Sequence, residues 1–188
     1  MDEASTQLLA DTAPPLPAAP GHPAREDYHY ERRGTQSLFL FFDPVRGWRR
    51  VSAQDSRTKL DWAEQVRVLL EEDHPQARKV KLVCDNLNTH VEDALYGAFE
   101  PARARALLRR LEIHYTPVHA SWLNVAEIEL SVLARQCLGR RLPSVQALKA
   151  EVAAWQRDRN ASADRVVWRF TTADARIKLR HLYPVILE

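Results

Sequence analysis

A short apolar run that ends at an aspartate is the feature that most constrains this chain. Residues 80–84 (VKLVC) lead directly into Asp85, and turn-forming polar residues follow as far as His90. This pattern predicts a buried, largely parallel strand, although a buried helical segment would give the same local pattern. Because ligands of open α/β sheets gather at the carboxyl ends of such strands, we expect Asp85 to lie at a functional site.

The other apolar patterns predict a mixture of strands and helices. Residues 37–43 and 48–53, which are separated by a Pro- and Gly-containing turn, are typical of an antiparallel hairpin. Residues 111–115 alternate like a further strand. Helical spacing is expected over residues 58–73, 92–110 with an interruption at Pro101, 123–137, 144–159 and 173–182. This order of elements indicates an α/β protein in which helices cover a mixed sheet.

Length and composition favour one globular domain over residues 1–188. Prolines at 14, 15, 17, 20 and 23 predict a loop-rich start over residues 1–35, followed by a compact core over residues 36–188. Two distant cysteines, Cys84 and Cys137, are typical of buried thiols in a reducing compartment. The sequence has neither a signal peptide nor a long apolar run, so we expect a cytoplasmic protein without a membrane span.

Arginines occur as neighbours at four places, although the net charge is only +2. The pairs are Arg32-Arg33, Arg49-Arg50, Arg109-Arg110 and Arg140-Arg141. If they share one face, they form a basic patch that could hold phosphates. For any single pair, the alternative interpretation is an ordinary solvated surface.

Three carboxylates fall beside the ends of predicted elements, namely Asp2, Asp85 and Glu127. Oxygen ligands of this kind suit Mg²⁺, and two such ions about 3.5–4 Å apart can catalyse phosphodiester hydrolysis. Because the chain has 25 acids, spacing alone does not separate this interpretation from ordinary turn or capping roles.

Two longer blocks distinguish between these interpretations. Residues 85–90 (DNLNTH) and 114–127 (HYTPVHASWLNVAE) resemble the second and third catalytic blocks of DDE superfamily endonucleases. These are the catalytic domains of bacterial insertion-sequence transposases related to mariner. The resemblance continues through residues 135–138 and residues 168–184, so that it covers nearly the whole chain.

The resemblance implies an RNase H-like fold and a reaction that depends on two Mg²⁺ or Mn²⁺ ions. DNA would be hydrolysed at transposon ends, and the freed 3′-hydroxyl would attack target DNA. A homodimer or larger synaptic complex on the bacterial nucleoid is implied as well. Asp2, Asp85 and Glu127 resemble the first, second and third acids of the family. Glu129 is turned by roughly 200° from Glu127 on a helix, and we expect it to be solvated.

The neighbours of these acids have two interpretations each. Asn86, Asn88 and His90 either orient Asp85 and contact DNA or serve as ordinary turn and cap formers. His119 either meets a phosphate or is structural. Asn124 is a further candidate for contact with DNA or with the metal ligands.

The chain also departs from the family in two respects. It has no upstream helix-turn-helix region, and Met1 alone precedes Asp2. We therefore expect the first strand to be largely truncated and the chain to be a fragment of a split, frameshifted or wrongly started gene. A catalytically silent DNA-binding or dimerising remnant is accordingly the alternative function, and an RNase H-like nuclease unrelated to transposition is a third.

Overall fold

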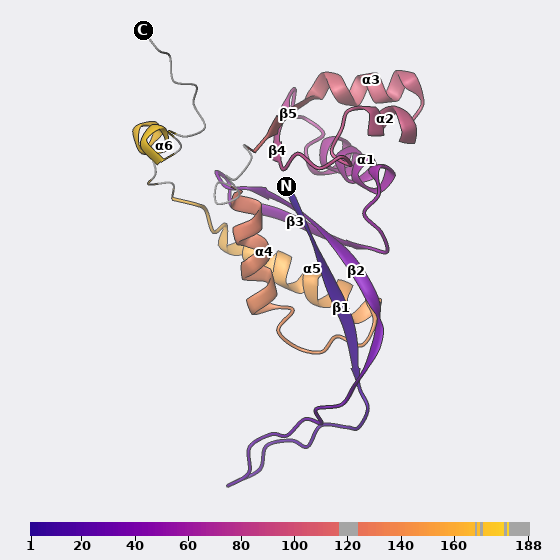
Figure 1. Cartoon of the computed structure of the whole chain (residues 1–188), viewed down its shortest axis with the longest axis vertical. Helices are drawn as coiled ribbons and strands as arrows, with labels where there is room; N and C mark the ends of the chain where they lie inside the picture. Colours follow the sequence, from indigo (N-terminus) through magenta and orange to yellow (C-terminus); the bar gives the residue numbers. More distant parts are fainter. Residues whose placement is uncertain (117–123, 168, 170, 179, 181–188) are drawn as a thin grey trace.

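The computed structural model describes residues 1–116, 124–167, 169, 171–178 and 180 (Figure 1). Its elements alternate between strands and helices, so the predicted α/β class is confirmed. They are β1 (Asp2–Asp11), β2 (Tyr30–Asp43), β3 (Trp48–Gln54), α1 (Lys59–Val68), the π-helical turn η1 (Leu69–Asp73), β4 (Val80–Cys84), α2 (Asp93–Ala98), α3 (Pro101–Arg110), β5 (Leu111–Tyr115), α4 (Val125–Gln136), α5 (Val145–Ser162) and α6 (Thr172–Lys178).

The antiparallel sheet β1-β2-β3 is covered on both faces. Successive residues of β2 point to opposite sides, as the pleat of a strand requires. Leu38 and Leu40 pack in the cluster that includes α4 and α5, whereas Phe39 and Phe41 pack in the cluster that includes α1, α2 and α3. Two apolar cores therefore lie on either side of one sheet, and Figure 1 shows the two helical layers.

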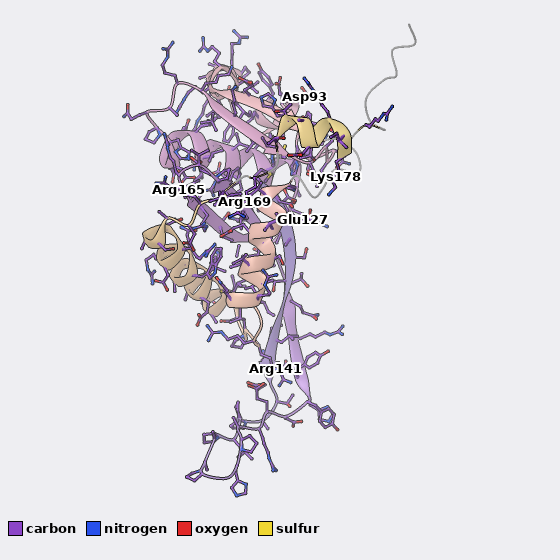
Figure 2. All side chains as sticks on the ribbon, turned by 90° about the vertical axis from the view of Figure 1, so that its left-hand side faces the viewer. Asp93, Glu127, Arg141, Arg165, Arg169 and Lys178 are labelled. Atoms are coloured by element: carbon purple, nitrogen blue, oxygen red, sulfur yellow. The ribbon has the colours of Figure 1, made fainter. Side chains whose placement is uncertain are left out.

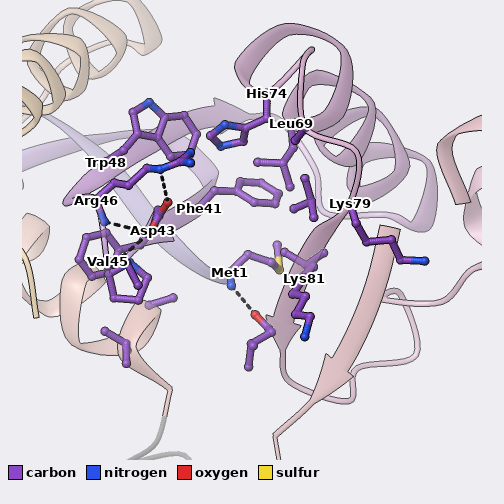
Figure 3. A pocket seen from close by; sticks show the side chains of 18 of the residues that line it. Met1, Phe41, Asp43, Val45, Arg46, Trp48, Leu69, His74, Lys79 and Lys81 are labelled. Atoms are coloured by element: carbon purple, nitrogen blue, oxygen red, sulfur yellow. Dashed lines mark hydrogen bonds and ion pairs between the residues drawn. The ribbon is translucent and has the colours of Figure 1, made fainter. Parts of the chain in front are cut away.

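The run at residues 80–84 is a strand, which excludes the helical alternative. β4 pairs in parallel with β5 from Val80 opposite Leu111 to Cys84 opposite Tyr115. These two strands form a separate small sheet beside the start of β1. The Met1 ammonium donates a hydrogen bond to the Val83 carbonyl oxygen at 2.5 Å, and this contact links the two sheets (Figure 3).

Side chains that cap helices explain several element boundaries. Thr58 and Asp61 form a capping box at the start of α1, and Pro101 occupies the first turn of α3. Ser144 accepts a hydrogen bond from the Ala147 amide and so begins α5. The predicted helices at residues 58–73, 92–110 and 144–159 are confirmed by these boundaries.

The start of the chain differs from our expectation. Residues 2–11 form a ten-residue strand that runs past Asp2 and pairs with β2 from Asp2 opposite Leu40 to Asp11 opposite Tyr30. The apolar pattern concealed it, because β1 lies at a sheet edge and only Leu8 is fully buried within it. The segment between the end of β1 and the start of β2 extends beyond the body of the molecule as an arm (Figure 1).

Other expectations have mixed outcomes. Cys84 and Cys137 are buried free thiols, as predicted. The last helix is present over residues 172–178, and its predicted extension to residue 182 lies mostly outside the described residues. None of the described helices combines the length and the apolar character needed to cross a membrane.

Candidate active site

Asp2 lies at the beginning of β1, and its carboxylate is held from two sides. Its Oδ1 accepts a hydrogen bond from the Glu3 amide at 2.7 Å, and its Oδ2 accepts one from Asn124 Nδ2 at 2.9 Å. Asn124 is also the N-cap of α4, because its Oδ1 accepts from the Ala126 amide at 3.2 Å. One amide side chain therefore fixes the start of α4 relative to Asp2.

The pKa of Asp2 is raised, and the causes identify its neighbours. Burial of the carboxyl is the largest cause, and the charges of Asp85 and Glu127 raise the pKa further. The hydrogen bond from the Glu3 amide and the charge of the Met1 ammonium act in the opposite direction. Asp85 and Glu127 thus each lie within electrostatic range of Asp2.

Asp85 follows β4 directly, and its carboxylate is partly open to solvent. The side chain is 38% exposed, and its Oδ1 lies 2.9 Å from His90 Nδ1. Nδ1 makes its hydrogen bond with the Asp85 main-chain oxygen at 3.2 Å. Among the described atoms, Asp85 Oδ1 therefore has the His90 ring as an ion-pair neighbour but no hydrogen-bond donor.

His90 is the most enclosed polar residue near these acids. Its side chain is fully buried, and Nε2 lies 2.9 Å from Glu3 Oε1, which is 2% exposed. The Trp62 ring stacks on the imidazole at a centroid distance of 5.7 Å. The His90 main-chain oxygen accepts a hydrogen bond from the Tyr115 hydroxyl at 2.7 Å. Of the two interpretations of His90, contact with Asp85 is the one that this geometry supports.

These contacts also determine the charge of the imidazole. Burial on its own would lower the pKa of His90, but hydrogen bonds with Cys84, Glu3 and the Asp85 main chain raise it to about 10. Nε2 faces the Glu3 carboxylate and Nδ1 faces the Asp85 main-chain oxygen, which is the arrangement of an imidazolium that donates in two directions.

Glu127 projects from the first turn of α4 and is exposed (Figure 2). Its charge contributes to the raised pKa of Asp2, so it belongs to the same environment. The described residues nevertheless contain no group of three or more Asp, Glu, His or Cys side chains close enough to bind one ion together. The three acids are therefore neighbours that do not form a closed cage.

Glu129 is not solvated, contrary to our expectation. Its side chain is 6% exposed and forms ion pairs with Arg49 Nε at 2.7 Å and with Arg159 Nη2 at 3.2 Å. The rotation argument correctly separated Glu129 from Glu127, but the face of α4 that carries Glu129 is turned inward, toward Arg49 of β3 and Arg159 of α5, and is not open to water.

The arginine pairs do not form the predicted basic patch as a set. Arg49 is fully buried, and Arg50 is mostly buried beside Asp73, to which it forms an ion pair at 2.5 Å. Both are inward-facing because helical layers cover the two faces of β3. Arg110 and Arg141 bind main-chain carbonyl oxygens.

Among the described contacts, no side-chain hydrogen bond joins Asn86 or Asn88 to these acids. Asn86 and Asn88 are exposed in the loop after β4. His119 lies outside the described residues. Conversely, Glu3 was missed as a member of the site, since its role became visible only once β1 was known to be a strand whose adjacent side chains point to opposite faces.

Comparison with known proteins identifies the family to which the chain belongs. The family model described as DDE superfamily endonuclease matches residues 1–149. Because this match covers most of the chain, the chain belongs to the DDE superfamily endonucleases, and its fold is RNase H-like. Searches of curated proteins and of solved structures gave no match.

Members of this family act on DNA as nucleases and use divalent metal ions. The residues present fit such ions by the chemistry of their donors. Asp2, Asp85 and Glu127 supply only carboxylate oxygens, which are the ligands that Mg²⁺ and Mn²⁺ prefer. The Asp85 side chain is partly exposed, so an ion can reach its carboxylate from solvent.

Proposed function

We propose that this chain is the catalytic domain, over residues 1–188, of a bacterial insertion-sequence transposase related to mariner. Its reaction is hydrolysis of DNA at the transposon ends, followed by attack of the freed 3′-hydroxyl on target DNA. One observation carries the proposal: Asp2 on β1 lies within range of the charges of both Asp85, which follows β4, and Glu127, which lies on α4. A homodimer or larger assembly on the DNA completes the proposal.

The three acids share one role in this reaction, which is to bind metal ions. Asp2, Asp85 and Glu127 would hold two Mg²⁺ or Mn²⁺ ions between them. When bound, such ions lower the pKa of a water nucleophile and stabilise the charge on the scissile phosphate. Asn124 and the Glu3 amide fix both oxygens of Asp2 in advance, which limits the reorganisation needed when the reaction begins.

Nicking of supercoiled plasmid DNA in Mn²⁺ tests the proposal. We expect the wild-type chain to convert the plasmid to its open-circular form, and Asp85→Asn to abolish this conversion. Asp158→Asn is the matched control, because Asp158 is an exposed acid on α5. It should nick as the wild type does.

Other outcomes would redirect the interpretation. Equal nicking by Asp85→Asn and the wild type would exclude Asp85 as a ligand. DNA binding that weakens steeply with salt, without any nicking by the wild type, would support the catalytically silent remnant instead. The observation that favours this second candidate is that the described acids do not form a closed ligand group.

A further inference from the structure

Two of the proposed metal ligands belong to different sheets. Asp2 lies on β1 of the antiparallel sheet, and Asp85 immediately follows β4 of the parallel sheet. No ladder of paired strands joins these two sheets within the described residues. The separation of the two carboxylates must therefore be set by contacts other than regular strand pairing.

One chain of side-chain contacts crosses between the sheets at this point. Glu3, the neighbour of Asp2 on β1, lies 2.9 Å from His90 Nε2 through its Oε1. The other ring nitrogen, Nδ1, lies 2.9 Å from Asp85 Oδ1 and 3.2 Å from the Asp85 main-chain oxygen. A single imidazole thus contacts β1 with one nitrogen and the residue after β4 with the other.

The imidazole has little freedom to move. Its ring stacks on Trp62, and its side chain is fully buried. Its main-chain oxygen accepts from the Tyr115 hydroxyl at 2.7 Å, and its amide donates to the Leu87 oxygen at 3.0 Å. A ring held on its face, on both nitrogens and on its backbone can fix the distance between two groups.

From this geometry we infer that His90, held by Glu3, is a positioning residue that sets the separation of Asp2 and Asp85 across the two sheets. The inference rests on the proposed function, since it assigns the two acids to one pair of ions. A core that needed only packing would not require the 2%-exposed Glu3 carboxylate beside a buried imidazole, because removing charged groups from water is unfavourable. In this role neither Glu3 nor His90 is itself a metal ligand.

Mn²⁺ binding without DNA, measured by the electron paramagnetic resonance of free Mn²⁺, gives a test that does not depend on activity. His90→Gln can keep the contact with Glu3 and lose the one with Asp85, whereas His90→Asn can do the reverse. Loss of a residue that orients a metal ligand typically weakens metal binding by about 10–100-fold. We expect both variants to fall in that range, and nicking to recover when Mn²⁺ is raised to saturation.

Three further variants separate positioning from general loosening. Tyr115→Phe removes one hydrogen bond to the His90 backbone and leaves both ring contacts in place, so it should weaken Mn²⁺ binding less than either His90 variant does. Glu3→Gln retains an acceptor for Nε2 and should bind Mn²⁺ better than Glu3→Ala. Circular dichroism confirms that each variant is folded before its affinity is compared.

The outcomes distinguish this inference from the proposed function. If Asp85→Asn weakens Mn²⁺ binding but both His90 variants bind as the wild type does, the positioning role is wrong and the metal site stands. If Asp85→Asn also binds Mn²⁺ normally, the proposed function itself fails. If Tyr115→Phe weakens binding as much as His90→Gln, His90 acts through general packing, and the inference is overturned.

Discussion

Helix α4 contributes one glutamate to each of two very different surroundings. Glu127, with Asp2 and Asp85, belongs to what we call the open acid site, where Asp2 accepts a hydrogen bond from Asn124 and Asp85 lies 2.9 Å from the His90 ring. Glu129, with Arg49 and Arg159, belongs to the closed ion cluster, where two guanidinium groups surround a buried carboxylate. The two glutamates are two residues apart in the sequence.

The difference between the two sites shows that one helix can contribute to stability on one face and to a reactive site on the other. In the closed ion cluster each charge has a partner, and Arg49 also donates to the carbonyl oxygens of Arg159 and Asp164 at 2.7 and 3.0 Å. In the open acid site the carboxylates repel one another, and the pKa of Asp2 is raised, first by burial and then by its acidic neighbours. A folded protein keeps such repulsion where a cation is to be bound.

The largest expected effect comes from opening the closed ion cluster. Glu129→Gln keeps the size of the side chain and removes its charge, so that the fully buried Arg49 loses its carboxylate partner. Breaking a buried pair costs about 3–5 kcal/mol, and a protein of this size loses about 2–4 °C of melting temperature per kcal/mol. Thermal unfolding followed by circular dichroism should show a fall on the order of 10 °C.

Glu127→Gln is the matched control, because it makes the same chemical change two residues earlier on the same helix. A melting temperature for Glu129→Gln equal to that of the wild type would mean that the carbonyl oxygens alone satisfy Arg49. The closed ion cluster would then have no stabilising role.

The sequence predicted this helix and the separation of its two glutamates, but not the surroundings of each. Helical spacing gave residues 123–137, close to the observed Val125–Gln136, and the rotation between positions 127 and 129 followed from helix geometry. Burial of Glu129 depends on Arg49 from β3 and Arg159 from α5, residues far apart in the sequence. Only the three-layer packing brings them together.

For the open acid site, too, the sequence predicted some of the residues but not the surroundings that the fold gives them. A family resemblance selected its three acids, and the strand before Asp85 could be predicted from its apolar run. Glu3 could not be identified, because β1 lies at a sheet edge and carries too few buried residues for a clear alternation. Without β1 as a strand, nothing places Glu3 on the face opposite Asp2 and beside His90.

The next largest expected effect is the change in melting temperature on addition of divalent metal, which should depend on the open acid site and not on the closed ion cluster. A ligand at about a hundredfold excess over its dissociation constant stabilises the folded state by about 2.7 kcal/mol. For the wild type this corresponds to a rise of roughly 5–10 °C in melting temperature on addition of Mn²⁺. Glu129→Gln should have a lower melting temperature than the wild type but show the same rise on addition of Mn²⁺, because the substituted residue lies on the other face of α4.

Asp85→Asn provides the opposite case for the metal experiment. It leaves the closed ion cluster intact, so its melting temperature without metal should stay near that of the wild type, while the rise with Mn²⁺ should shrink or vanish. An undiminished rise in Asp85→Asn would place the bound metal elsewhere and would remove the basis for contrasting the two surroundings.

The smallest expected effect is that of Glu127→Gln on stability without metal. Removing an acid from the first turn of α4 loses a favourable interaction with the helix dipole of about 0.3–1 kcal/mol. Removing the same charge also relieves its repulsion of Asp2, which acts in the opposite direction. The two terms should nearly cancel, because exposed substitutions usually change stability by no more than about 0.5 kcal/mol, or roughly 1–2 °C. The rise in melting temperature on addition of Mn²⁺ should nevertheless be lost in Glu127→Gln. One glutamate of α4 would then govern the response to metal and the other the stability of the fold. If Glu127→Gln instead lowered the melting temperature without metal as much as Glu129→Gln does, both glutamates would be structural.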